Sequence, residues 1–129
     1  MHITQETDYA IRIVYCLCKS STRRDARSIS DEVGVSLRFS LKILGKLSGA
    51  GLVKSYKGNR GGYELAKEPG EISMADVICV VEGAPAVNRC VNGSCACDME
   101  SDCPFHSVFV ETSRVLNDKL ESVTFAQML

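Results

Sequence analysis

The segment from residue 28 to residue 66 constrains the fold more than any other part of this 129-residue chain. A helical pattern with Ser28 as its expected N-cap ends near Val33 and is followed by Gly34, which suits a tight turn. A second helical pattern covers 36–48, and two β-prone runs then flank a Gly- and Asn-rich turn. Two helices joined by a tight turn and followed by a hairpin predict a winged helix-turn-helix.

Further helical patterns flank this segment. The first begins near Thr7, with Thr7 or Asp8 as the expected N-cap, and ends near residues 19–21. A later pattern is expected to start at Ser73, a suitable N-cap, and to end near Gly83. Together these patterns predict a fold that is mainly α with a small β-hairpin wing.

The C-terminal segment has the pattern of a long amphipathic helix. Apolar side chains recur at helical spacing from Phe105 to Val123, about 28 Å at ~1.5 Å per residue. We expect a homodimer that pairs through this helix, because a helix-turn-helix protein usually contacts two half-sites about 34 Å apart. The expected division is a DNA-binding domain (1–83), a loop (84–104) and a dimerisation helix with its tail (105–129).

The net charge of −1 conceals an uneven distribution. Residues 1–68 carry 12 Lys or Arg against 7 Asp or Glu, a net of +5, whereas residues 69–129 carry 3 against 9, a net of −6. The stretch 33–63 has six basic residues and no acidic residue. A local basic face is typical of modules that bind nucleic-acid phosphate, although a solvated surface can have the same composition.

The side chains expected to contact double-stranded DNA lie on the second helix of the motif and at the wing. Arg38 suits a bidentate contact to guanine, and Asn59 and Arg60 suit a narrow minor groove. The order Phe39-Ser40-Leu41 leaves two alternatives: Leu41 is exposed to the groove, or the helix is slightly rotated. The complete predicted set is Ser36, Arg38, Phe39, Ser40, Lys42, Lys57, Asn59, Arg60 and Gly61.

The cellular compartment decides how the seven cysteines are interpreted. No apolar stretch is long enough to cross a bilayer, and the first residues lack the features of a secretory signal, so we expect a cytoplasmic protein without a membrane partner. In that reducing compartment an odd number of cysteines favours metal or redox chemistry over disulfides. Cys16, Cys18 and Cys79 fall in expected helices and are interpreted as buried, small apolar side chains.

The loop and its C-terminal flank contain four thiols and an imidazole within 17 residues: Cys90, Cys95, Cys97, Cys103 and His106. Thiolates with open spacing suit an iron–sulfur cluster or zinc, and free cysteines are the alternative. Zinc sites more often have Cys-x-x-Cys pairs, which this segment lacks. The sequence therefore favours an iron–sulfur cluster bound by the 84–104 loop.

The chain resembles the Rrf2 family of winged-helix transcription regulators over nearly its whole length. The resemblance is carried by the opening Thr7 to Ala10, the stretch Lys42 to Val53, the wing Gly58 to Tyr63, the stretch Ile72 to Val81, and the cysteine loop before the long helix. It implies a homodimer on a palindromic operator, whose DNA affinity depends on an iron–sulfur cluster that senses redox state, nitric oxide or iron–sulfur status.

The resemblance also implies a set of cluster ligands. Three loop cysteines bind the cluster in this family, and the five-residue gap between the last two matches Cys97 and Cys103, which leaves Cys90 as the first. Cys95 is then a spare thiol, an exchange ligand, or a ligand in place of Cys90 or Cys97.

Two residues are candidates for the fourth ligand. His106 stands where members with a 2Fe–2S cluster have a histidine, and Asp8 matches the position from which the partner subunit completes a 4Fe–4S cluster in other members. A fourth cysteine or a small ligand is the remaining alternative.

Two other functions stay open on the residues alone. A thiol- or zinc-dependent DNA-binding regulator would use the same cysteines without a cluster. A small iron–sulfur electron-transfer protein would leave the acid-free basic stretch 33–63 unexplained. An enzyme is not expected, because the chain has two histidines, no nucleophile elbow and no phosphate-binding loop.

Overall fold

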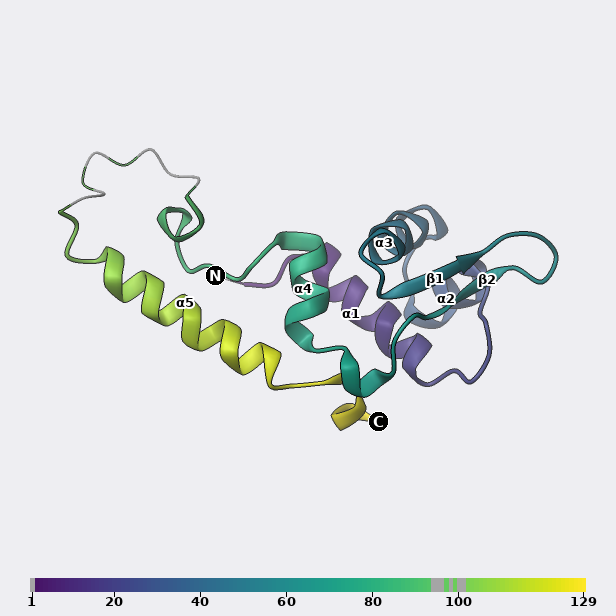
Figure 1. Cartoon of the computed structure of the whole chain (residues 1–129). Coiled ribbons are helices and arrows are strands. Elements are labelled where there is room, and N and C mark those ends of the chain that lie inside the picture. Colours follow the sequence, from purple (N-terminus) through teal and green to yellow (C-terminus); the bar gives the residue numbers. More distant parts are fainter. Residues whose placement is uncertain (1, 94–96, 98, 100–101) are drawn as a thin grey trace.

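Figure 1 shows the chain, a computed structural model that describes residues 2–93, 97, 99 and 102–129. The helices of the described residues are α1 (Gln5–Cys18), α2 (Ala26–Val33), α3 (Leu37–Gly49), α4 (Met74–Glu82) and α5 (His106–Glu121). The strands β1 (Val53–Tyr56) and β2 (Gly62–Leu65) pair antiparallel. Short 3-10 turns lie at Pro69–Glu71, Arg89–Asn92 and Phe125–Met128. The fold class, mainly α with a β-hairpin wing, is as predicted.

Helix α1 lies at the centre of the hydrophobic core and contacts α2, α3 and α4. Its Ile13 and Val14 are fully buried, as are Ile43 and Leu44 of α3. Full burial of a side chain of this size contributes about 1.5–3 kcal/mol. This packing fixes one face of α3 against α1 and leaves its opposite face in solvent.

The N-caps of α1 and α2 differ from the predicted ones, because an earlier polar side chain takes the role. Thr4, rather than Thr7 or Asp8, caps α1 and accepts a hydrogen bond from the Thr7 amide at 3.3 Å. Asp25, rather than Ser28, caps α2 and accepts a hydrogen bond from the Ser28 amide at 2.6 Å. Each helix therefore begins at least two residues earlier than predicted.

The predicted turns around α3 are confirmed. Gly34 ends α2 in the left-handed conformation at φ 71°, which a glycine adopts without steric cost. Ser36 caps α3 and accepts a hydrogen bond from the Phe39 amide at 3.2 Å. Gly51 follows α3 at φ 78°, and Leu52 returns to the core.

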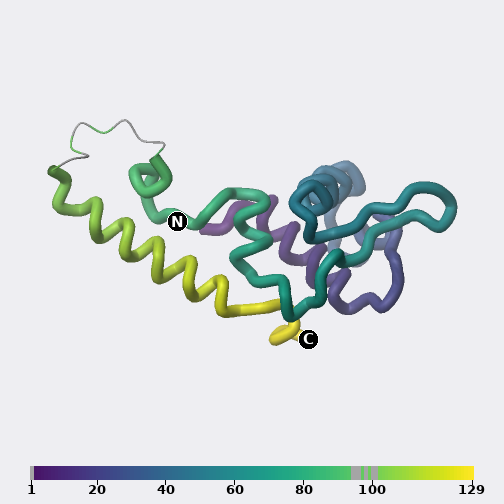
Figure 2. The backbone as a smooth tube through the Cα atoms, viewed as in Figure 1, coloured from purple at the N-terminus to yellow at the C-terminus, as the bar shows by residue number. Residues whose placement is uncertain are grey.

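The wing is a four-residue antiparallel ladder that projects from the body (Figure 2). Its register pairs Val53 with Leu65 and Tyr56 with Gly62. Tyr63 also exchanges two backbone hydrogen bonds with Arg24, at 2.8 and 3.0 Å, which attaches the wing to the connection before α2. A Cβ atom on Gly62 would lie 2.7 Å from the Arg24 carbonyl oxygen, so this close approach requires glycine.

The predicted start and end of α4 are confirmed. Ser73 caps the helix in a capping box with Asp76, and Gly83 follows its last turn. Ser73 also pairs with Thr124 beyond α5, and the Phe125 amide donates to the Ile72 carbonyl at 3.0 Å. The fully buried Phe125 ring thus joins the core around α1.

Helix α5 follows the 84–104 loop, here called the cysteine segment. Its C-terminal end lies at the core, and its N-terminal end lies away from α3 and the wing (Figure 2). Apolar side chains along it are exposed in the single chain, among them Phe105, Val108 and Val115. No helix within the described ranges combines the length and apolarity that a membrane crossing requires.

Candidate functional site

Helix α3 presents the exposed face that the sequence assigned to DNA. Ile43 and Leu47 are buried, whereas Arg38 is exposed, as expected, and Leu41 is 43% exposed, the first of its two alternatives. Ser40 corrects the prediction: its side chain is fully buried, and its hydroxyl has no hydrogen-bond partner among the described residues. A buried hydroxyl does not contact base edges, so Ser40 is removed from the set of DNA contacts.

Two other predicted contacts have structural roles in α3. The Ser36 hydroxyl is occupied as the N-cap. Phe39 is half-buried, and its ring packs edge-on against Tyr9 with 5.7 Å between the ring centroids. These interactions fix the start of α3, and they leave Arg38 and Leu41 as its exposed side chains in this turn.

A carboxylate from α1 contacts the basic face of α3. Glu6 Oε1 lies 2.6 Å from Lys46 Nζ and 3.5 Å from Lys42 Nζ. The hydrogen bond from Lys46 is the main cause that lowers the pKa of Glu6, so the carboxyl is ionised at neutral pH. Sequence patterns did not indicate this contact, because 40 positions separate Glu6 from Lys46 and no motif contains both.

The wing tip carries the exposed side chains Lys57, Asn59 and Arg60. Arg23 packs against β1 of the wing, with its guanidinium carbon 3.3 Å from the centroid of the Tyr56 ring. Arg23 Nη1 also donates to the Arg60 carbonyl at 3.4 Å. Arg23 therefore supports the wing, a role that no sequence pattern indicated.

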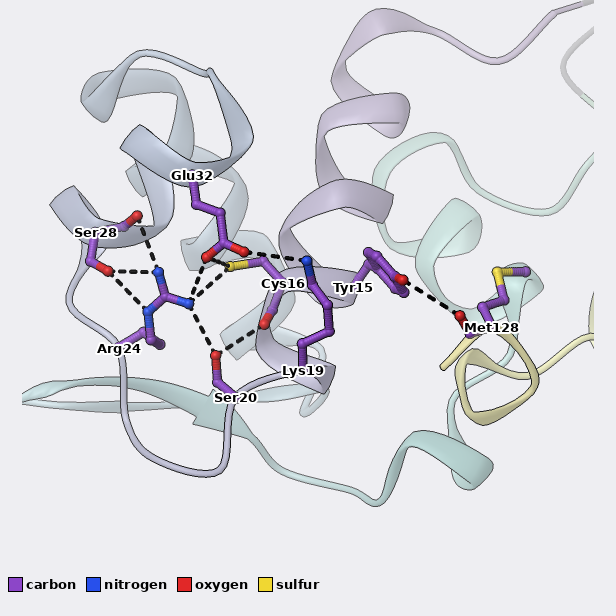
Figure 3. A network of polar contacts seen from close by, with 8 residues as sticks. All are labelled: Tyr15, Cys16, Lys19, Ser20, Arg24, Ser28, Glu32 and Met128. Atoms are coloured by element: carbon purple, nitrogen blue, oxygen red, sulfur yellow. Dashed lines mark hydrogen bonds and ion pairs between the residues drawn. The ribbon is translucent and has the colours of Figure 1, made fainter.

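Figure 3 shows a polar network that joins α1 and α2 beside the wing. Arg24 Nη1 lies 2.7 Å from Glu32 Oε2 and donates to Cys16 Sγ at 3.4 Å, and Cys16 donates to Glu32 at 3.2 Å. Burial is the main cause that raises the pKa of Cys16 to about 11. Cys16 is therefore a buried, protonated thiol, which confirms its structural interpretation. Hydrogen bonds from Cys16, Arg24 and Lys19 lower the pKa of Glu32 to about 2.

The other two helical cysteines are less buried than predicted. Cys18 is half-buried, and burial raises its pKa to about 11. Cys79 is exposed, so its predicted burial is wrong. The neighbouring Val77 and Ile78 form the buried face of α4, and the helical rotation turns the next position to solvent.

Three of the four loop cysteines lie within the described residues. Cys90 and Cys103 are half-buried, and Cys97 is exposed. Cys95, the additional candidate ligand, lies outside the described residues. Within the described ranges, no three Cys, His, Asp or Glu side chains are close enough together to hold a metal ion.

Two contacts attach the ends of the cysteine segment to α5. The Val87 amide donates to the hydroxyl of the buried Ser113 at 2.9 Å, and the His106 amide donates to the Cys103 carbonyl at 3.4 Å. The Nδ1 atom of His106 is buried without a hydrogen-bond partner in the part of the chain that the structure describes. Thiolates and an imidazole nitrogen are both donor types that iron accepts.

Asp8, the other candidate for the fourth ligand, lies in the first turn of α1. Its carboxylate is 2.9 Å from the Arg12 guanidinium, and both side chains are about half exposed. Because an exposed ion pair of this kind contributes little to stability, the Asp8 carboxylate can leave Arg12 at little cost and contact a second protein surface.

The chain is similar to known proteins along its full length. The sequence profile of the Rrf2 family, described as an iron-dependent transcriptional regulator, matches residues 3–129. The HTH-type transcriptional regulator IscR of Vibrio cholerae is 28% identical over 100% of this chain and 75% of its own length. Protein aau3 of Rhizobium meliloti is 29% identical over 100% of this chain and 85% of its own.

Two solved structures have the same fold. T. potens IscR superposes with a TM-score of 0.75 at 27% identity, covering 99% of this chain and 85% of its own. The oxidised form of Staphylococcus aureus CymR superposes with a TM-score of 0.74 at 26% identity, covering 97% of this chain and 93% of its own.

Proposed function

Because the chain belongs to the Rrf2 family of transcriptional regulators, we propose that it is a homodimeric DNA-binding regulator whose operator affinity is controlled by an iron–sulfur cluster. The cysteine segment at the N-terminal end of α5 carries this proposal. There Cys90 and Cys103 are half-buried, and His106 has a buried ring nitrogen without a partner in the described ranges. The family's description as iron-dependent supports the same assignment.

Cys90, Cys97 and Cys103 are the proposed thiolate ligands, with Cys95 as an additional or exchange ligand. A bound cluster would supply an iron centre that changes redox state and exchanges ligands. The fourth ligand is Asp8 of the partner subunit or His106. An oxygen or imidazole donor is displaced from iron more readily than a thiolate, which suits a sensor of oxidant, nitric oxide or iron–sulfur status.

Alanine variants distinguish the two candidates for the fourth ligand. We expect Asp8→Ala to alter the visible spectrum and to abolish the dependence of DNA affinity on the cluster, because Asp8 lies on the DNA-binding domain and His106 lies on α5. His106→Ala is the matched variant and is expected to keep both properties. Spectra and iron content after anaerobic purification measure the effect, and the reverse pattern would assign the ligand to His106.

The same dimer would place α3 and the wing of each subunit on one half-site of a palindromic operator in the cytoplasm. Arg38 and Leu41 are the proposed contacts to base edges, and the exposed Asn59 and Arg60 are the proposed minor-groove contacts. Lys57 is proposed to bind phosphate, and Gly61 lets the wing backbone approach the duplex.

Arg60→Ala is expected to weaken specific DNA binding by about 1–3 kcal/mol. The side chain is exposed, while Arg23 contacts the Arg60 backbone carbonyl, so the substitution removes a DNA contact and leaves the support of the wing intact. Fluorescence anisotropy at fixed salt on a selected operator measures the change. Lys67→Ala, which removes an exposed positive charge after β2, is the control; equal affinities of the two variants would argue against a wing contact.

A thiol- or zinc-dependent regulator without a cluster is the second candidate. Its thiol-dependent form is supported by the fold similarity to an oxidised form of CymR. The deciding experiment is anaerobic purification followed by an absorbance spectrum and by counts of iron and acid-labile sulfide per chain. Visible absorption with both elements supports the cluster. A colourless protein without sulfide, even after reconstitution, supports the second candidate.

A further inference from the structure

The carboxylate of Glu6 connects the first turn of α1 to the basic face of α3. One oxygen, Oε1, lies 2.6 Å from Lys46 Nζ and 3.5 Å from Lys42 Nζ. The Glu6 side chain is only 22% exposed, whereas the Lys42 side chain is 56% exposed. Glu6 is therefore held between its own helix and two lysines that border the proposed DNA-binding face.

The two lysines occupy positions on α3 that suit contacts to the DNA backbone. Arg38, Lys42 and Lys46 follow one another at four-residue spacing, so they lie along one side of the helix. An ammonium group binds a phosphate oxygen and a carboxylate oxygen by the same charge-assisted hydrogen bond. While Glu6 contacts both lysines, its carboxylate takes the place that a phosphate oxygen would otherwise fill.

We propose that Glu6 is a specificity-determining residue that competes with DNA phosphate for Lys42 and Lys46. Contacts to phosphate supply most of the affinity for non-specific DNA and carry no sequence information. A residue that occupies two phosphate-binding lysines therefore lowers non-specific binding more than operator binding, because base contacts compensate only on the operator. The inference rests on the proposed function, since it requires DNA to bind along α3.

The test uses Glu6→Gln in the full-length protein with a fluorescent 30-base-pair duplex of random sequence. The amide keeps the shape of the side chain and removes the charge that competes with phosphate. We expect a three- to tenfold gain in affinity, and a plot of log K against log[KCl] that is steeper by roughly 0.9 for each lysine released. Glu121→Gln is the matched control, because it removes the same charge from an exposed position on α5.

A second set of variants separates competition from a change in folding. Lys42→Gln combined with Lys46→Gln removes the cations, and in that background we expect Glu6→Gln to have no effect on affinity. A loss of affinity in Glu6→Gln would overturn the proposal, because it would mean that Glu6 orients the lysines for DNA. A gain equal to that of Glu121→Gln would also overturn it. If neither the wild-type protein nor Glu6→Gln bound the random duplex or a selected operator, the proposed function itself would fail.

Discussion

A protein in which Cys103 is replaced by serine is expected to purify anaerobically without visible absorption and with less than about a tenth of the wild-type iron and sulfide. Serine has nearly the shape of cysteine, but its hydroxyl is not ionised at neutral pH and does not replace a thiolate on iron. Cys103 is half-buried, and its carbonyl accepts a hydrogen bond from the first amide of α5. The substitution therefore removes a ligand at the point where the segment joins the helix.

Cys79→Ser is the control for this experiment. Cys79 is exposed on α4, so its substitution also removes one thiol but leaves the proposed ligands unchanged. We expect this control to keep its iron, sulfide and visible spectrum. Full cluster content in Cys103→Ser would exclude Cys103 as a ligand. Cys95→Ser and Cys97→Ser, measured in parallel, test the additional thiol. If Cys95→Ser loses iron and sulfide while Cys97→Ser keeps them, Cys95 is the ligand and Cys97 is the additional thiol.

The elements around α3 were predictable because their signals are local. Gly34 forms the predicted tight turn, and α3 begins next to Ser36 as predicted, although Ser36 was expected to contact DNA and is the N-cap of the helix. The buried position of Ser40 also follows from a local signal, because residues 40, 43, 44 and 47 have the i, i+3, i+4, i+7 spacing of one helix face. The prediction of a DNA contact gave more weight to its polar side chain than to this spacing.

Contacts between distant parts of the chain were beyond sequence patterns. The burial of Phe125 in the core around α1 depends on the pairing of Ser73 with Thr124, which no periodicity within α5 indicates. The contact of Glu6 with Lys46 joins two helices across 40 positions. Ion pairs of this kind follow from the arrangement of the helices, and a helical pattern alone does not specify the partner.

For the candidate metal site the sequence predicts the types of ligand but not their geometry. Cysteine density and spacing select the donor types, because thiolates are the common ligands of iron–sulfur clusters. The fourth ligand depends on which residues approach the loop in the dimer, and the spacing within one chain does not encode that approach. Asp8 and His106 are therefore both compatible with the pattern, although they lie on α1 and α5.

Val115→Asp is expected to convert the proposed dimer into a monomer of 14.0 kDa. Phe105, Val108 and Val115 are 60%, 58% and 58% exposed in the single chain, a large apolar area for one helix. In a two-fold dimer each substitution is present twice, and two buried valines contribute roughly 3–6 kcal/mol to the free energy of dimerisation. We therefore expect the dimer dissociation constant to rise more than about 100-fold. Sedimentation equilibrium over a range of protein concentrations measures this constant.

The choice of Val115 separates dimerisation from folding. Leu116 and Leu120 of α5 line a cavity of about 580 Å³ whose other walls include Ile78 and Glu82 of α4. A charge at either leucine would therefore also disturb the monomer. Ser107 is exposed on the side of α5 that carries Glu111 and Arg114, and Ser107→Asp adds the same charge away from the apolar stripe. If both variants remain dimers, α5 is not the interface. If only Val115→Asp dissociates, its operator affinity should fall as well, because a monomer binds one half-site at a time.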